Sequence, residues 1–202
     1  MDKSRNFKFA GLGICLMLFC CACENNPPVP KPPCYLKTDF PAHDYYEVNV
    51  KNPVMNYQVQ LSKLFNVKRN LSDKAFGFQE IDLGLINGTL LLYSRRFDHM
   101  DTLANLINDA NDLVDEHKIK ADRIDFEQIM DPAHRKFGTF FILKGNVATN
   151  YQFYLTDSTS HFIRGEVLLN CRPNYDSLRP TLDYLKLDLD AFIQSFRWNN
   201  KM

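Results

Sequence analysis

The chain has few of the features by which enzymes and nucleotide-binding proteins are recognised in sequence. Glycine is scarce, with 8 residues in 202, and neither a Walker loop nor a G-x-G-x-x-G dinucleotide motif is present. The G-x-S-x-G turn that carries the nucleophile of many hydrolases is absent as well. These absences argue against a phosphate-cradling loop and give no sign of a nucleotide cofactor.

The histidines are too scattered for a metal site. Zinc sites use three or four ligands, usually with short spacings on one element. No two of the 5 histidines have such a spacing; they are His43, His99, His117, His134 and His161. The sequence therefore predicts neither a metal nor any other cofactor.

Positive charge is not in excess. The whole chain has 24 basic and 24 acidic side chains. Three basic residues and one acidic residue belong to the N-terminal leader described below, which leaves 21 basic and 23 acidic residues. A slightly negative protein has no electrostatic reason to bind nucleic acid, so no nucleic-acid partner is predicted.

The N-terminus contains a short hydrophobic run with the pattern of an export signal. Three basic residues precede an apolar run of 14 residues from Phe9 to Ala22. This run is too short to span a bilayer as a helix, which takes about 20 residues, but it suits the core of a signal peptide. We predict a lipoprotein signal peptide over residues 1–22.

The run ends in a cluster of cysteines, of which Cys23 is the predicted lipidation site. An acylated cysteine follows a small residue, and Cys23 follows Ala22. Cys21 is the second choice, and a simple secretory leader cut near Ala22 is the alternative to a lipid anchor. Metal binding by Cys20, Cys21 and Cys23 is disfavoured, because they lie in a hydrophobic export segment without a matching cluster downstream.

Residues 23–33 form the predicted lipid anchor and a proline-rich linker. Five prolines in this stretch favour an extended spacer that would hold the next segment off the membrane. Residues 34–202 are long enough for a single globular domain with a proper core. In an oxidising compartment, Cys34 and Cys171 of this domain would form either a disulfide or two separate thiols.

The first half of the domain is predicted to consist of short strands. Apolar segments bounded by Pro41 and Pro53 predict strands at residues 35–40, 45–50 and 56–61. Farther on, the dipeptide Asn87-Gly88 separates two apolar runs at residues 81–86 and 89–93. Such a dipeptide is typical of a two-residue hairpin turn, because both turn positions take a positive φ.

Two amphipathic helices are predicted in the second half. Apolar residues recur every three or four positions over residues 101–117 and again over residues 177–197. Asp98 or Asp101 is expected to cap the first helix. Pro180 is expected in the first turn of the second helix, where a missing N–H costs little.

Between these helices the sequence predicts a short helical turn and three strands. The helical turn covers residues 125–130 and ends before Pro132. Alternating apolar residues predict strands in meander order at residues 137–143, 148–155 and 161–170. The order of elements predicts an α+β fold, a mostly antiparallel sheet flanked by helices. This order is similar to an α/β/α sandwich of the Mog1/PsbP type.

One block in the second half resembles a known family. Residues 145–180 read GNVATNYQFYLTDSTSHFIRGEVLLNCRPNYDSLRP. They meet nearly every fixed position of the pattern G-N-x-A-[ST]-x-x-Q-F-x-L-T-D-S-T-x-H-F-x-R-G-x-L-x-x-N-x-R-P-N-x-D-S-L-x-P. In this the chain resembles the GldD family, lipoproteins of the gliding-motility and secretion apparatus of Bacteroidetes-type bacteria. The resemblance implies an accessory, non-enzymatic role. The family usually has other residues at the positions of Cys34 and Cys171.

Four residues of this block could in principle be catalytic: Asp157, Ser158, Ser160 and His161. A Ser–His–Asp triad needs the histidine between the serine and the carboxylate in space, which one tight turn seldom provides. The same residue types cap backbone N–H groups in turns. We therefore interpret the segment as a turn or a partner surface and predict no catalytic residue.

Six residues of the block are candidates for partner contact. Arginine and asparagine side chains on or beside the last strand could form a binding patch. They could equally join the Arg-Pro-Asn turn to the final helix through salt bridges and caps. Together with two turn residues, the candidates are Asp157, His161, Arg164, Asn170, Arg172 and Asn174.

Two functions of different classes fit the sequence. The first is a lipid-anchored, non-enzymatic accessory protein of gliding motility or type IX secretion, which assembles or stabilises proteins of the cell envelope. The second is a periplasmic ligand-binding or hydrolytic sandwich domain. In both, the domain faces the periplasm, and in the first it contacts a membrane through its lipid anchor.

Overall fold

The strands of the protein form two antiparallel sheets, which a computed structural model describes over residues 39–51, 53–72 and 76–199. The larger sheet has the order β3-β4-β5-β9-β8-β7-β6. Its strands are β3 (Asn66–Ser72), β4 (Phe76–Asp82), β5 (Gly88–Arg96), β6 (Ala121–Asp131), β7 (Lys136–Gly145), β8 (Tyr151–Thr156) and β9 (His161–Leu169). The smaller sheet has the order β1-β2-β10, with β1 (Tyr45–Lys51), β2 (Asn56–Ser62) and β10 (Arg197–Trp198).

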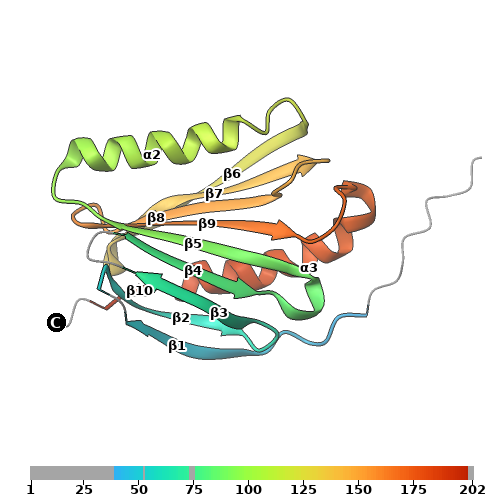
Figure 1. The fold of residues 1–202 in the computed structure, drawn as a ribbon, viewed down its shortest axis with the longest axis horizontal. Coiled ribbons are helices and arrows are strands. Elements are labelled where there is room, and N and C mark those ends of the chain that lie inside the picture. Colours follow the sequence, from blue (N-terminus) through green and yellow to red (C-terminus); the bar gives the residue numbers. More distant parts are fainter. Residues whose placement is uncertain (1–38, 52, 73–75, 200–202) are drawn as a thin grey trace, which may run out of the picture. The chain divides into compact units, whose positions relative to one another are not determined.

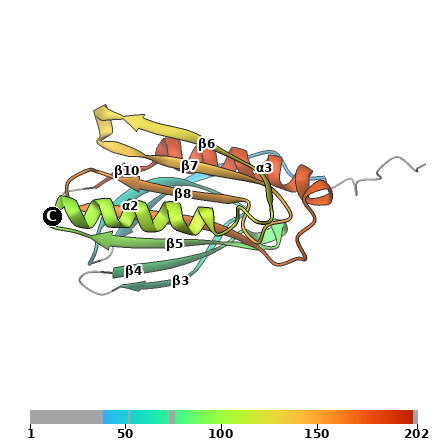
Figure 2. The same ribbon diagram turned by 90° about the horizontal axis from the view of Figure 1, so that it is seen from above.

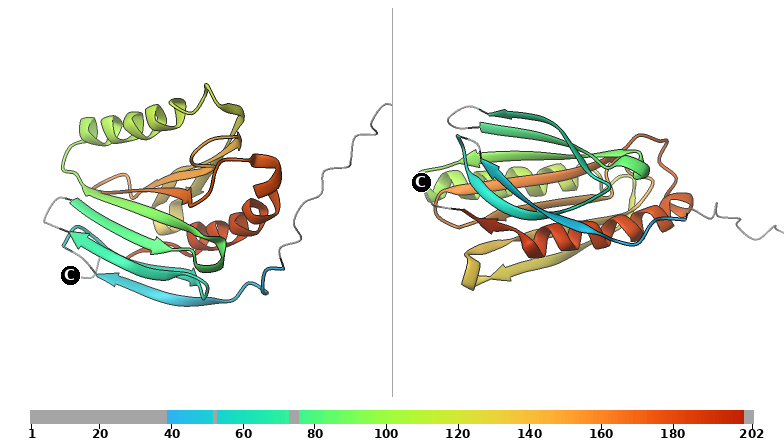
Figure 3. Two further views of the ribbon diagram at one scale, coloured as in Figure 1. Left: turned by 45° about the vertical axis from the view of Figure 1, so that its right-hand side comes forward. Right: turned by 90° about the horizontal axis from the view of Figure 1, so that it is seen from below.

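Two long helices cover opposite faces of the larger sheet (Figure 1). Helix α2 (Met100–Asp115) runs lengthwise between β5 and β8 in Figure 2, over the position of β9, where Leu103 and Ala110 pack against Phe162. Helix α3 (Tyr175–Ser195) lies on the other face, beside the smaller sheet (Figure 3). The predicted α+β fold with helices flanking an antiparallel sheet is therefore confirmed. The likeness to the Mog1/PsbP type stays a prediction.

The main core lies between the larger sheet and a layer made by α3 and the smaller sheet. Leu185 and Leu189 of α3 are fully buried, and the ring centroid of Phe192 lies 5.7 Å from that of Phe153 on β8. Each such side chain contributes roughly 1.5–3 kcal/mol when it is fully buried. The predicted apolar stripe of the last helix is confirmed, and its buried members are Leu182, Leu185, Leu189, Phe192 and Phe196.

Most of the predicted strands are present. The strands expected at residues 45–50 and 56–61 are β1 and β2, and the predicted meander is β7, β8 and β9 in adjacent positions. Of the strand expected at residues 35–40, the first four residues lie outside the described part, and the last two are not in a strand. Strand β3 was not predicted, because all seven of its residues are exposed and give no apolar periodicity.

The start of α3 differs from the prediction. The helix begins at Tyr175, so Pro180 lies in its second turn and cannot bond to the carbonyl of Asp176. The helix continues through this position because its buried stripe holds it against the sheet. Asn174 caps the start, since its Oδ1 accepts a hydrogen bond from the N–H of Ser177 at 3.4 Å. In α2, neither Asp98 nor Asp101 is the cap: that position is His99, which makes no side-chain capping bond.

Residues 125–130 are an extended edge strand, which corrects the predicted helical turn. They belong to β6, which pairs with β7 from Ala121 to Asp131. Ile124 and Ile129 point to opposite faces of the sheet. Ile129 packs against the main core, and Ile124 packs against a separate apolar cluster that includes Val114 of α2. Pairing with β7 thus decides the conformation, and Pro132 opens only a short 3-10 turn, η3 (Pro132–His134).

The connection at Asn87-Gly88 is longer than the predicted two-residue turn. A 3-10 turn, η2 (Gly84–Ile86), lies between β4 and β5. Asn87 has a left-handed φ of 53°, whereas Gly88 is already the first residue of β5. A Cβ at Gly88 would lie 2.8 Å from the backbone oxygen of Leu168. The glycine therefore permits close approach of two strands.

Candidate functional site

The turn between β8 and β9 is built around the carboxylate of Asp157, which is 1% exposed. Its Oδ1 accepts hydrogen bonds from the N–H groups of Thr159, Ser160 and His161 at 2.9, 2.8 and 2.9 Å. Its Oδ2 lies 2.8 Å from Nδ1 of His161 and 3.2 Å from Oγ of Ser160. One side chain therefore organises the whole turn, as the residue types predict.

These contacts fix the charge of Asp157. Burial by itself would raise the pKa of the carboxyl group. The hydrogen bonds from His161 and from the backbone N–H groups of Ser160, His161 and Thr159 favour the anion more strongly. The pKa consequently lies well below its usual range, and Asp157 is an anion at physiological pH.

The arrangement around His161 is unsuited to activating a serine. Oγ of Ser160 lies 2.9 Å from Nδ1 of His161, the same nitrogen that faces Asp157. In a Ser–His–Asp triad, the serine and the carboxylate bind different nitrogens of the imidazole, so that the ring can take the serine proton. The other serine, Ser158, has a left-handed φ of 60°, and its N–H donates to Oγ1 of Thr156 at 3.0 Å. Both serines therefore take part in turn geometry.

Two residues from other parts of the chain complete this end of the molecule. The ring of Trp198 on β10 stacks on His161 with a centroid distance of 5.9 Å. The Nε1–H of Trp198 donates to the backbone oxygen of Arg135 at 3.0 Å. Nη2 of Arg135 in turn donates to Oγ1 of Thr159 at 2.8 Å. The β8–β9 turn, β10 and the segment after η3 are thereby joined in one cluster.

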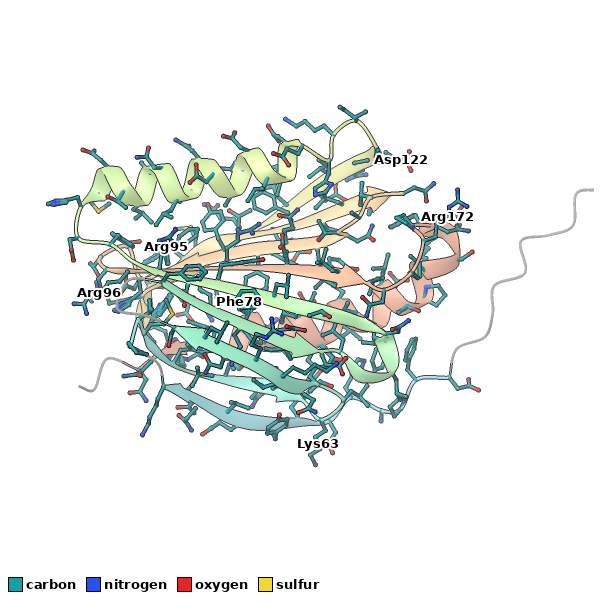
Figure 4. All side chains as sticks on the ribbon, viewed as in Figure 1. Lys63, Phe78, Arg95, Arg96, Asp122 and Arg172 are labelled. Atoms are coloured by element: carbon teal, nitrogen blue, oxygen red, sulfur yellow. The ribbon has the colours of Figure 1, made fainter. Side chains whose placement is uncertain are left out.

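The six predicted partner-contact residues lie in three separate places. Asp157 and His161 are at the beginning of β9, whereas Asn170, Arg172 and Asn174 follow its end. Figure 4 shows this separation, because Arg96, the β5 neighbour of His161, and Arg172 are at opposite ends of the molecule. The structure thus brings two candidates together at one end and three at the other.

Arg164, the sixth candidate, lies in the middle of β9 on the face that carries α2. Its guanidinium carbon is 4.9 Å from the ring centroid of Tyr93, and its Nη1 is 3.1 Å from Oε2 of Glu166. Stacking on an aromatic ring and pairing with a carboxylate both fix its position. Arg164 therefore occupies the sheet surface and not the end of the strand.

At the far end of β9 the asparagines join neighbouring segments. The N–H of Asn170 donates to the backbone oxygen of Asn87 at 2.9 Å, which connects this end to the β4–β5 connection. Asn174 caps α3, as described above. Arg172 is exposed and makes no hydrogen bond or ion pair with any residue that the structure describes.

A comparison with protein-family models identifies the family to which the chain is similar. The model described as gliding motility lipoprotein GldD matches residues 25–198. The chain belongs to the GldD family. The match extends well beyond residues 145–180 and includes all the helices and strands described above. No curated protein matches the chain.

Several residues that meet the GldD pattern have a structural reason in this fold. Gly145 has a φ of 123°, and a Cβ there would lie 2.7 Å from the backbone nitrogen of Asp122. A Cβ at Gly165 would lie 2.3 Å from the ring of Phe153. Oδ1 of Asn146 accepts a hydrogen bond from the N–H of Tyr175 at 2.8 Å and so fixes the start of α3.

The remaining predicted sites concern cysteines and metals. Cys171 has an exposed side chain. Cys23 and Cys34 lie outside the described residues, so lipidation and the disulfide stay predictions. Within the described part of the chain, no group of three His, Cys, Asp or Glu residues could hold a metal ion.

Sequence reasoning missed three residues at the His161 end, namely Arg96, Arg135 and Trp198. No motif marks them, and they come from three distant segments. Arg135 has one distinguishing property, a left-handed φ of 50°, which is visible only in the folded chain.

Proposed function

We propose that this member of the GldD family is a lipid-anchored accessory protein of the gliding-motility and type IX secretion machinery. It assembles or stabilises partner proteins of the cell envelope and performs no bond chemistry. Membership of the GldD family identifies the chain as a gliding-motility lipoprotein. The domain would face the periplasm, because an acylated N-terminal cysteine of an exported protein places the chain on that side.

The geometry of the β8–β9 turn is the observation that supports a non-enzymatic role. This turn lies within the block that meets the family pattern, and Asp157, Ser160 and His161 bind each other there. Oδ1 of Asp157 accepts three backbone hydrogen bonds, and Nδ1 of His161 serves both Asp157 and Ser160. Such an arrangement supports a rigid surface for binding, and it disfavours the alternative of a hydrolytic domain.

The lipid anchor has a direct test in Cys23→Ser. No helix among the described residues is long and apolar enough to cross a membrane. If three acyl chains on Cys23 supply the attachment, at roughly 0.8 kcal/mol per buried methylene, the variant should be either soluble or unprocessed. Phase partitioning in a non-ionic detergent, together with the size of the protein on a gel, measures this, with Cys21→Ser as the matched control. Retention of a processed Cys23→Ser protein in the detergent phase would place the anchor elsewhere.

The accessory role predicts physical partners in the envelope. Crosslinking of living cells before lysis, followed by purification of the anchored protein, should recover other proteins of the gliding apparatus. Deleting the gene should lower the steady-state amounts of those partners, since an unassembled subunit is degraded. Unchanged partner amounts together with an absence of crosslinked proteins would count against this role. Covalent labelling of Ser160 by a fluorophosphonate would instead establish a hydrolase.

A further inference from the structure

A recess of about 290 Å³ lies at the His161 end, between residues of the two sheets. One wall comes from residues 53–56, which lead into β2, and from Asn199 after β10. The other wall comes from Arg96 at the end of β5, Arg135 after η3 and the first residues of β9. None of the described residues that line the recess is acidic.

Arg96 brings an uncompensated positive charge to this recess. It is the cross-strand neighbour of His161, since the two residues pair between β5 and β9. Its guanidinium makes no hydrogen bond or ion pair with any described residue. A guanidinium offers five N–H donors in a planar fork, all of which remain available to a ligand.

Arg135 reaches the recess from a strained backbone. Its φ of 50° is in the left-handed region, which is unfavourable for a non-glycine residue. Glycine or asparagine would adopt this conformation with less strain. The side chain is held by Thr159 Oγ1 at 2.8 Å and by the backbone oxygen of Asp157 at 3.4 Å, both from Nη2. This conformation ends η3, where the N–H of Arg135 donates to the backbone oxygen of Pro132 at 3.2 Å, and the side chain of Arg135 lines the recess.

His161 also lines the recess, and its orientation is fixed. The buried carboxylate of Asp157 binds Nδ1, and Trp198 covers one face of the ring. No residue that the structure describes hydrogen-bonds to Nε2. The nitrogen opposite Asp157 is therefore available to a group in the recess.

We infer that this recess binds the carboxylate group of an acidic side chain on a partner polypeptide. Two guanidinium forks match the two oxygens of a carboxylate, and the side chains of Asn56 and Asn199 on the opposite wall can pair with peptide groups. A membrane surface is the less suitable ligand, because anionic lipids attract exposed clusters of about four to eight basic residues and not a recess with two arginines. The inference rests on the proposed function only for the identity of the partner as an envelope protein.

A titration of the isotope-labelled, full-length protein tests this site without any partner. The probe is N-acetyl-glutamate N-methylamide, and N-acetyl-glutamine N-methylamide is the uncharged control. At constant ionic strength, the glutamate probe should shift the Nε–H signals of Arg96 and Arg135 and the amide signals of Thr159 and His161. The glutamine probe should not shift them.

The variants Arg96→Ala and Arg95→Ala form a matched pair. They are neighbours on β5 with side chains on opposite faces, and the guanidinium of Arg95 lies 5.1 Å from the ring of Phe76 and away from the recess. We expect Arg96→Ala and Arg135→Gly each to weaken binding of the glutamate probe about tenfold, as for loss of a charge-assisted bond. Arg95→Ala should bind like the parent protein.

Four results would overturn the inference. They are the absence of shifts with the glutamate probe, equal losses in Arg95→Ala and Arg96→Ala, tighter binding of inorganic phosphate than of the probe, and Arg96-dependent binding to phosphatidylglycerol vesicles. The last two would assign the recess to phosphate groups, free or lipid-borne. A positive titration combined with unchanged partner amounts in the gene deletion and an absence of crosslinked proteins would leave the site intact and remove the proposed function.

Discussion

Replacing Asp157 by alanine is expected to destabilise the protein by about 3–5 kcal/mol. Three backbone N–H groups would lose their acceptor, and His161 and Ser160 would lose a charged partner. These donors are partly buried, so the loss of their acceptor leaves a desolvation cost that an ordinary surface contact does not have. Urea unfolding measures the change. The only tryptophan, Trp198, stacks on His161 and reports on the turn through its fluorescence.

Asp157→Asn is the control for charge, because it keeps one oxygen as an acceptor for the backbone N–H groups. It should lose less stability than Asp157→Ala. It should also lack the pH-dependent contribution that the carboxylate makes to stability. The folded pKa of Asp157 is lowered, so the carboxylate stabilises the fold above its unfolded pKa of about 3.9, and this contribution disappears as the pH falls below that value. The stabilities of parent and Asn variant should therefore converge toward low pH. Parallel curves between pH 6 and pH 3 would contradict this account.

His43→Ala is expected to cost about 3–5 kcal/mol, because it leaves the buried side chain of Asp188 without its hydrogen-bond partner. Nδ1 of His43 lies 2.7 Å from Oδ1 of Asp188, whose side chain is fully buried in α3. Oδ2 of Asp188 has no hydrogen-bond partner within the described part of the chain. His43 also stacks on Tyr184, with ring centroids 4.1 Å apart. Burial, followed by a side-chain hydrogen bond with Asp188 and the charge of Asp188, raises the pKa of Tyr45 to about 12.

The double variant His43→Ala with Asp188→Leu separates charge from packing. Removing both members of a buried pair is often nearly neutral, so the second change should restore much of the lost stability. Urea unfolding of the parent, both single variants and the double variant completes the thermodynamic cycle. A double variant that is less stable than His43→Ala would show that Asp188 contributes independently of the histidine.

The parts of the fold that were predictable are those with a strong apolar period. Helices α2 and α3 and the meander β7–β8–β9 have apolar residues at regular spacing, and the sequence pattern locates them within a few residues. Strand β3 has no buried residue, and β6 owes its extended form to pairing with β7. Tertiary pairing decides such edge strands, and local sequence therefore does not reveal them.

In the candidate site, too, the local features were predictable and the long-range ones were not. Asp157 and its turn were predictable, since Thr, Asp and Ser in a row have a local preference for closing turns. The charged recess was not predictable, because Arg96, Arg135 and His161 meet only when β5 pairs with β9 and β10 returns to β2. The two arginines are 39 positions apart in the chain, and no local spacing connects them.

The last strand, β10, pairs with β2, so segments from both ends of the domain must meet before the smaller sheet is complete. The N–H of Gln60 on β2 donates to Oγ of Ser195, a contact across 135 positions, and His43 reaches Asp188 across 145 positions. Such distant contacts form slowly, because the intervening chain must first be brought together. The first strands consequently have no finished core until residues near 198 are available. A chain that passes through a membrane from its N-terminus would stay unfolded during transit and fold only after nearly all of it has crossed.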